Sequence, residues 1–101
     1  MKNILLVCAA GMSTSMLVNK MEEAAKGSEE EIKINATSGG DLEKYVQDAD
    51  VLLLGPQVSY LKGDYQKKYD SIPVEVINSL DYGTMNGQKV LDWALDLIES
   101  K

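Results

Sequence analysis

Two short runs of uninterrupted apolar residues constrain this fold more than any other feature of the sequence. They are Ile4-Leu5-Leu6-Val7 and Val51-Leu52-Leu53-Leu54, and neither shows the polar alternation of a strand with one solvated face. Such runs are typical of strands that are covered on both faces of a sheet. The sequence therefore predicts central strands over residues 3–8 and 51–54.

Weaker signals place two edge strands and four helices around these runs. Residues 32–36 alternate between apolar and polar side chains, and residues 73–77 alternate in part and open with a proline, which suits an edge. Ser13 and Asp41 are the expected N-caps of the first two helices. Apolar residues recur at helical spacing in four segments, namely residues 13–26, 41–49, 58–72 and the stretch after a loop at 78–87.

The alternation of strands and helices predicts an α/β fold with a single open four-stranded parallel sheet and helices on both faces. Right-handed crossovers, with the two apolar strands in the middle, give the strand order 2-1-3-4. Ligands bind such sheets beyond the carboxyl ends of the strands, where the winding direction reverses. That point lies between the first and third strands, where Cys8 ends one strand and Gly55-Pro56-Gln57 follows the other.

Composition excludes several classes of function. At 101 residues the chain is expected to form one domain over residues 1–101, and it has no apolar run near the roughly 20 residues that span a bilayer. The net charge is −6 and all ten basic residues are lysines, which disfavours nucleic acid binding. Without histidine, the chain has no general base that titrates near neutral pH. The single cysteine excludes an internal disulfide and suits a reducing cytoplasm, and we expect neither a metal nor a cofactor.

Cys8 lies where a buried strand gives way to a glycine-containing turn and then to the start of a helix. The first amides of a helix have no intrahelical partner, and together with the helix dipole they favour a negative charge. A turn that curls around one point makes these donors an anion nest. We expect a nucleophilic sulfur at Cys8, and a phosphoryl group on that sulfur held by the loop that follows. The loop residues are Ala9, Ala10, Gly11, Met12, Ser13, Thr14 and Ser15.

A lone cysteine at the end of an apolar strand is also compatible with an inert small hydrophobe. In that interpretation Ser13 and Thr14 serve only as helix caps. Capping requires one hydroxyl, however, whereas this turn has three consecutive hydroxyls and a glycine. The excess favours a functional loop.

The Cys8 loop resembles the signature loop of low-molecular-weight protein tyrosine phosphatases, and the predicted fold resembles theirs. Those enzymes have an arginine where Thr14 stands, and it binds phosphate through two hydrogen bonds. Without that arginine we expect a phosphoryl group to be held and not hydrolysed. Two alternatives stay open, a phosphatase or arsenate reductase that lacks its arginine or resolving cysteine, and a non-catalytic module that binds an anion.

Three segments together resemble the enzyme IIB components of the bacterial phosphoenolpyruvate-dependent sugar phosphotransferase system, lactose/cellobiose (chitobiose) family. They are residues 4–15, residues 51–58 and Tyr82-Gly83-Thr84-Met85-Asn86-Gly87. The resemblance implies that Cys8 takes a phosphoryl group from a phosphohistidine of enzyme IIA. It also implies that the group passes to a disaccharide held by the membrane permease, enzyme IIC. The chain would then be a cytoplasmic protein-phosphocysteine–sugar phosphotransferase that associates with the permease without inserting into the membrane.

Transfer between two partners requires a surface around Cys8 that docks each partner in turn. Methionine suits such a surface because it adapts to different partners. Met16 is equally compatible with packing, and Asp81, which resembles the general-acid position of the phosphatases, is more simply a turn residue. The candidate rim contacts are Met16, Pro56, Gln57, Asp81, Tyr82 and Met85.

Overall fold

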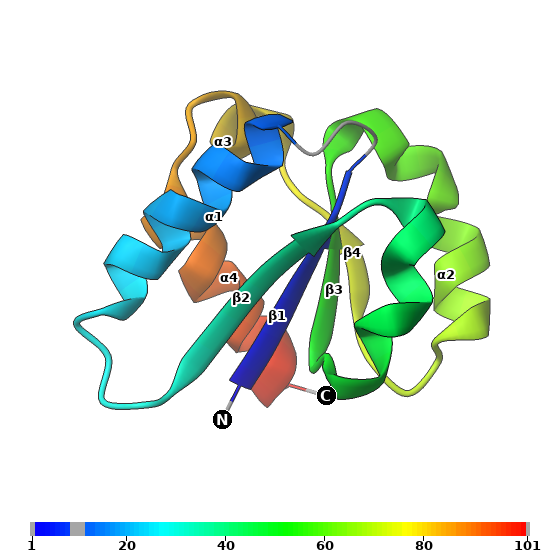
Figure 1. Cartoon of the computed structure of the whole chain (residues 1–101), viewed down its shortest axis with the longest axis horizontal. Helices are drawn as coiled ribbons and strands as arrows, with labels where there is room; N and C mark the ends of the chain where they lie inside the picture. The colour runs from blue at the N-terminus through cyan, green and yellow to red at the C-terminus, as the bar shows by residue number, and fades with distance from the viewer. Residues whose placement is uncertain (1, 9–11, 101) are drawn as a thin grey trace.

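The computed structural model describes residues 2–8 and 12–100, and its centre is a four-stranded parallel sheet (Figure 1). The strands lie in the order β2-β1-β3-β4, which confirms the predicted order and places the two alternating strands at the edges. In this register Leu5 pairs with Asn35 on one side and with Leu52 on the other. The strands are β1 (Lys2–Val7), β2 (Ile32–Thr37), β3 (Val51–Leu54) and β4 (Val74–Val76).

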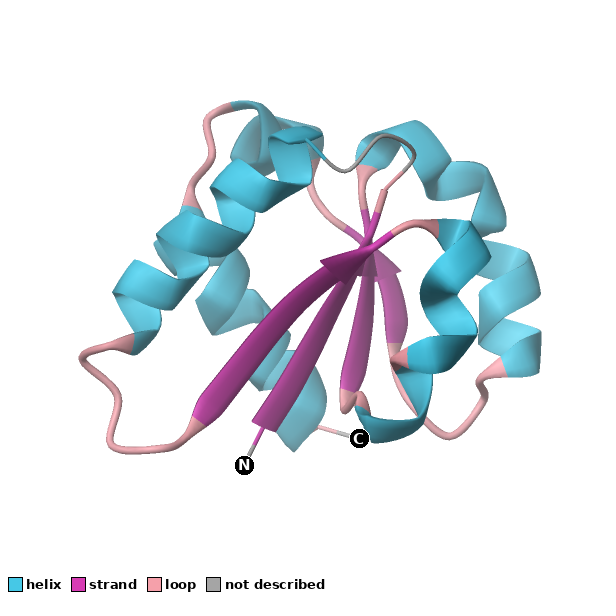
Figure 2. Ribbon diagram, viewed as in Figure 1, coloured by secondary structure: helices cyan, strands magenta, loops and turns pink. Residues whose placement is uncertain are grey.

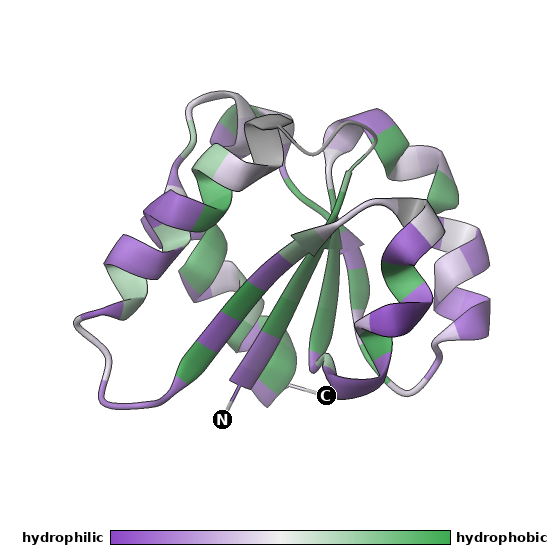
Figure 3. Cartoon of the chain, in the orientation of Figure 1, coloured by the Kyte–Doolittle hydropathy of each residue, from purple (hydrophilic) through white to green (hydrophobic). Residues whose placement is uncertain are grey.

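Figure 3 shows the two central strands as mostly hydrophobic, and their apolar residues are buried, as their unbroken sequences predict. Successive side chains of a strand point to opposite faces, so each strand contributes to two separate cores. Ile4, Leu6 and Leu53 belong to one core, whereas Leu5 and Leu54 belong to the other.

Helices α1 (Met12–Ala25) and α4 (Gly87–Glu99) cover one face of the sheet (Figure 2). The two helices approach closely at Gly87, where a Cβ atom would stand only 2.6 Å from the backbone nitrogen of Met21. Because α1 begins at Met12, Ser13 lies in the first turn of the helix and is not the predicted N-cap.

The other face is covered by shorter elements than the sequence predicts. Two 3-10 helices, η1 (Gly39–Lys44) and η2 (Val46–Asp48), replace the helix predicted at 41–49. Asp41 lies inside η1, whose N-cap is Ser38, so the predicted capping role of Asp41 is wrong. The helix predicted at 58–72 is replaced by η3 (Pro56–Leu61) and α2 (Lys62–Lys68), because the backbone leaves the helical region at Val58, where φ is −117°.

The loop predicted at 78–87 contains one further short helix, α3 (Ser79–Gly83), which follows the carboxyl end of β4. Asn78 caps this helix, since the backbone N–H groups of Leu80 and Asp81 donate to its Oδ1 atom at 2.8 and 3.3 Å. Asn86 caps α4 in the same way, through the N–H group of Lys89. The two caps fix the path of the chain between β4 and α4.

The two ends of the described chain meet at the amino edge of the sheet (Figure 1). Lys2 Nζ lies 3.0 Å from Glu99 Oε1 and 2.8 Å from Glu30 Oε2. Within the described part of the chain, no helix combines the length and the apolar character that crossing a bilayer requires.

Candidate functional site

Cys8 lies at the carboxyl edge of the sheet, between the ends of β2 and β3. Its backbone N–H group donates to the carbonyl oxygen of Thr37 at 3.2 Å. On the other side, the N–H group of Gly55 donates to the carbonyl oxygen of Val7 at 2.8 Å. The cysteine therefore occupies the predicted point where the winding of the sheet reverses. It is buried, with 3% of its surface exposed.

The loop after Cys8 leads directly into α1. Ala9, Ala10 and Gly11 lie outside the described residues, and so do the side chains of Met12, Ser13 and Thr14, so the predicted anion nest stays a prediction. The helix that follows is 14 residues long, and its first turn contains no acidic residue. Its first turn therefore carries no carboxylate that would oppose an anion bound at the amino end of the helix. Ser15, the last of the predicted loop residues, is exposed within this helix.

Gly55 is the point at which three side chains of the site converge. A Cβ atom on Gly55 would stand 3.6 Å from Cβ of Cys8, 3.6 Å from Cε2 of Tyr82 and 2.8 Å from Oε1 of Gln57. Glycine is thus the residue that leaves room for all three. Pro56 follows at the start of η3 and is half-buried, and the chain turns there so that Gln57 folds back over Gly55.

The structure places the two neighbouring residues Asp81 and Tyr82 differently, although both are candidate rim contacts. Tyr82 is 7% exposed and packs toward Gly55, so it forms a wall of the site and not an exposed rim. Asp81 Oδ1 lies 3.7 Å from Lys89 Nζ, across the gap between α3 and α4. Consecutive residues of a helix point about 100° apart, which is why Tyr82 faces Gly55 whereas Asp81 faces Lys89 of α4.

Exposed apolar side chains surround the carboxyl edge of the sheet. Met16 is 58% exposed on α1, and its role as a partner contact stays a prediction. Tyr60 in η3 and Leu80 in α3 are 76% and 70% exposed, and the sequence analysis missed both. In the sequence, each of them is only a large apolar residue shortly after the end of a strand. That each lies off the buried face becomes clear only once η3 and α3 are known.

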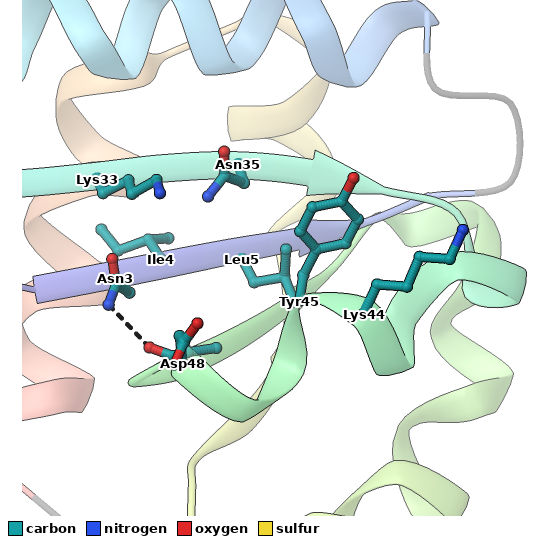
Figure 4. Close-up of a pocket in the computed structure, with 9 residues that line it drawn as sticks. Asn3, Ile4, Leu5, Lys33, Asn35, Lys44, Tyr45 and Asp48 are labelled. Atoms are coloured by element: carbon teal, nitrogen blue, oxygen red, sulfur yellow. Dashed lines mark hydrogen bonds between the residues drawn. The ribbon is translucent and has the colours of Figure 1, made fainter.

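A separate polar pocket lies against the amino half of β1 and β2, with a volume of about 330 Å³ (Figure 4). Its residues also brace the start of the sheet, since Asn3 Nδ2 donates to the carbonyl oxygen of Asp48 at 2.8 Å. The pocket includes no residue of the Cys8 site. In the described ranges, no group of three or more histidine, cysteine or acidic side chains is placed to hold a metal ion. The pocket is lined by Asn3, Ile4, Leu5, Lys33, Asn35, Lys44, Tyr45, Asp48 and Ala49.

Comparison with known proteins found matches along nearly the whole chain. A family model described as "PTS system, Lactose/Cellobiose specific IIB subunit" matches residues 3–92. The chain is 45% identical over 100 residues to the PTS system oligo-beta-mannoside-specific EIIB component of Bacillus subtilis (strain 168), and the match covers 97% of each protein. It superposes with a TM-score of 0.82 and 46% identity on the solution structure of a cellobiose-specific phosphotransferase IIB component protein from Borrelia burgdorferi, covering 99% of this chain and 94% of that one.

A more distant relative is much longer. The chain is 27% identical over 101 residues to the PTS system lactose-specific EIICB component of Lacticaseibacillus casei, and the match covers 97% of this chain but 17% of that protein. The family model and the relatives at 45 and 46% identity, each matching along nearly the whole chain, decide the assignment. The chain belongs to the lactose/cellobiose-specific IIB subunits of the sugar phosphotransferase system, the PTS.

Proposed function

We propose that this chain carries a phosphoryl group on Cys8, taken from a phosphohistidine of enzyme IIA and delivered to a disaccharide bound by enzyme IIC. The observation that carries the proposal is the position of Cys8. It ends a central strand, lies between the ends of β2 and β3, and directly precedes the loop that enters α1. Family membership supports the same function.

Both transfer steps are displacements at phosphorus. In the first, the thiolate of Cys8 attacks, an S–P bond forms, and the P–N bond to the imidazole of enzyme IIA breaks, leaving the electron pair on nitrogen. In the second, a sugar hydroxyl oxygen attacks, an O–P bond forms, the S–P bond breaks, and the sulfur leaves as a thiolate. The hydroxyl proton passes to water or to a base of the permease. The chain's task in both steps is to position the group and stabilise its charge.

One feature favours a carrier over a phosphatase. The sequence has no arginine, so the charged transition state of hydrolysis lacks the bidentate partner that phosphatases supply. A carrier requires slow hydrolysis, because a phosphoryl group lost to water never reaches the sugar.

The proposed docking surface for enzyme IIA is the apolar rim formed by Met16, Tyr60 and Leu80, all on elements that follow the strand ends near Cys8. We propose that Pro56, Gln57 and Met85 lie within the same footprint, that residues 1–101 act as one domain, and that this domain works on the cytoplasmic side of the permease. A relative named EIICB, which contains the matching region within a longer protein, supports association with enzyme IIC.

The test is phosphotransfer from phosphoenolpyruvate through the upstream PTS proteins, followed by mass spectrometry of this chain. We expect one phosphoryl group on Cys8, and its loss together with sugar phosphorylation in Cys8→Ser. Gln47→Ala, on the exposed surface of η2, serves as the matched control and should transfer normally. Continued phosphotransfer by Cys8→Ser would contradict the assignment, and rapid turnover of an aryl phosphate by the wild-type chain would favour the phosphatase.

The sugar is identified by the same assay with permease-containing membranes and a panel of disaccharides. The relatives described above are named for oligo-β-mannosides, cellobiose and lactose, so these β-linked sugars form the panel. We expect transfer to at least one of them, dependent on Cys8.

A further inference from the structure

Gln57 has an unusual position for an exposed side chain, because it turns back toward Gly55. Its Oε1 atom lies 2.8 Å from the position that a Cβ atom on Gly55 would take. Cβ of Cys8 lies 3.6 Å from the same position. The side chains of Gln57 and Cys8 therefore both lie next to Gly55, which directly follows β3.

The backbone from which the Gln57 side chain starts is fixed by its neighbours. Pro56 restricts the backbone directly before Gln57, and the N–H group of Val58 donates to the carbonyl oxygen of Gly55 at 3.0 Å, which closes the turn. The buried ring of Tyr82 reaches the same position from α3, at 3.6 Å. A glutamine side chain on a flexible loop samples many directions. The side chain of Gln57 extends from a turn whose backbone is fixed on both sides, so it samples fewer.

We propose that the side-chain amide of Gln57 donates a hydrogen bond to the phosphoryl group on Cys8. The proposal rests on the phosphocysteine function proposed above. A glutamine amide has two N–H donors and an acceptor oxygen on one planar group, and a half-turn of its last torsion exchanges their positions. No bond forms or breaks at Gln57, so its role is to hold the group and orient it.

The chemistry of an amide suits a carrier. A hydrogen bond from a neutral donor to a phosphoryl oxygen stabilises the phosphorylated state, and it adds no positive charge for the transition state of hydrolysis. An arginine in this place would provide that charge. Gln57 thus supplies a side-chain donor to a site whose sequence contains no arginine and no histidine.

The first test compares Gln57→Leu and Gln57→Glu with Gln47→Leu, which changes an exposed glutamine on η2. The readout is the equilibrium of the phosphoryl group between enzyme IIA and this chain, with the ³¹P resonance of the phosphocysteine. Loss of one hydrogen bond to a charged group corresponds to about a tenfold shift toward enzyme IIA. Gln57→Glu should shift it further, because a carboxylate repels the phosphoryl dianion. The ³¹P resonance should move in both Gln57 variants and stay in place in Gln47→Leu.

A second test moves the amide without changing Gln57. The Cβ atom in Gly55→Ala meets Gln57 Oε1 at 2.8 Å, the flexible end of a side chain, but keeps ordinary contact distances to Cys8 and Tyr82. Gly55 has a φ of −63°, which alanine adopts without strain. We expect Gly55→Ala to shift the equilibrium in the same direction as Gln57→Leu. The double variant, with Gly55→Ala and Gln57→Leu, should shift the equilibrium little further than either single variant, because both changes remove the same contact.

The outcomes separate this inference from the proposed function. If the wild-type chain forms phosphocysteine but Gln57→Leu leaves both the equilibrium and the ³¹P resonance unchanged, the role of Gln57 is overturned and the carrier function stands. If the wild-type chain forms no phosphocysteine, the function itself is overturned and the role of Gln57 with it. Thermal unfolding of each variant is measured alongside, and an altered equilibrium in a variant that melts like the wild type supports the inference.

Discussion

At the scale of single residues, Met85 has a backbone conformation that costs free energy. Among the described residues other than glycine, it alone has a positive φ, at 55°. The left-handed region places Cβ close to the following carbonyl oxygen and costs about 1–2 kcal/mol for most residues, but asparagine tolerates it. The conformation is required because the chain must turn from α3 into the Asn86 cap of α4.

We expect Met85→Asn to raise the free energy of unfolding by about 0.5–1 kcal/mol, because it relieves this strain. Urea unfolding followed by circular dichroism measures the change. Met16→Asn is the control, since it lies within α1, where asparagine is a weaker helix former and should cost a few tenths of a kcal/mol. A Met85→Asn variant that is less stable than wild type would show that side-chain contacts outweigh the strain.

At the scale of elements, α1 and α4 pack so closely at one position that a single methyl group does not fit. In Gly87→Ala the new Cβ atom would meet the backbone of α1 at Lys20 and Met21, and a backbone gives way less easily than a side chain. We expect a loss of about 1–3 kcal/mol in the free energy of unfolding. Gly83→Ala is the matched control, because nothing lies within 4 Å of its added Cβ atom. Equal stability of the two variants would contradict this packing.

Helix α2 should make stability depend on alkaline pH. Burial raises the pKa of Tyr65 above its ordinary value of about 10, and the nearby Tyr69 adds to the shift. The unfolded chain ionises this tyrosine first, so the stability it contributes is complete below about pH 10 and is lost as pH rises through the folded pKa. Urea unfolding at several alkaline pH values should show a smaller loss in Tyr65→Phe than in the wild type. An equal loss in both would contradict this role of Tyr65.

The elements that the sequence predicted well are those whose signal is long or unbroken. β1 and β3 lack polar alternation, which identifies them as central, and the sheet order follows from that. The helix predicted at 41–49 is wrong because Leu42, Val46 and Ala49, spaced four and three apart, are buried equally well by two 3-10 helices. α3 was missed because five residues are too few to show a period, and its only clear mark is the Asn78 cap.

The candidate site was predictable from the sequence only where it depends on the two central strands. Cys8 and Gly55 follow from the ends of the two central strands, so their proximity could be predicted before any coordinates. The burial of Tyr82 and the ion pair of Asp81 with Lys89 depend on α3, which the periodicity does not show. The direction of Gln57 depends on the turn at Pro56 and Val58, and a residue type alone does not reveal where its side chain points.

At the scale of the whole molecule, the apolar residues Met16, Tyr60 and Leu80 are exposed around one edge of the sheet. If enzyme IIA docks there, changing each to serine should raise the KM for phosphorylated enzyme IIA several-fold while the melting temperature changes little. Tyr45→Ser is the control, because Tyr45 is 47% exposed but lines the pocket at the amino half of β1 and β2. If Tyr45→Ser affects KM as strongly as the three rim variants do, the docking site lies elsewhere.

The contact between Lys2 and Glu99 has a consequence for how this domain is joined to others. Both ends of the described chain lie at the edge of the sheet where β1 begins, about 20 Å from Cys8 along a strand of this length. A polypeptide fused at either end leaves from the far side of the molecule and does not cross the reactive sulfur. Such a tether raises the local concentration of the domain beside its attached partner. It also leaves the carboxyl edge of the sheet, where Cys8 lies, free to meet a partner that is not attached. This placement of the two ends is therefore compatible with a separate subunit and with a module inside a longer protein, such as the EIICB relative.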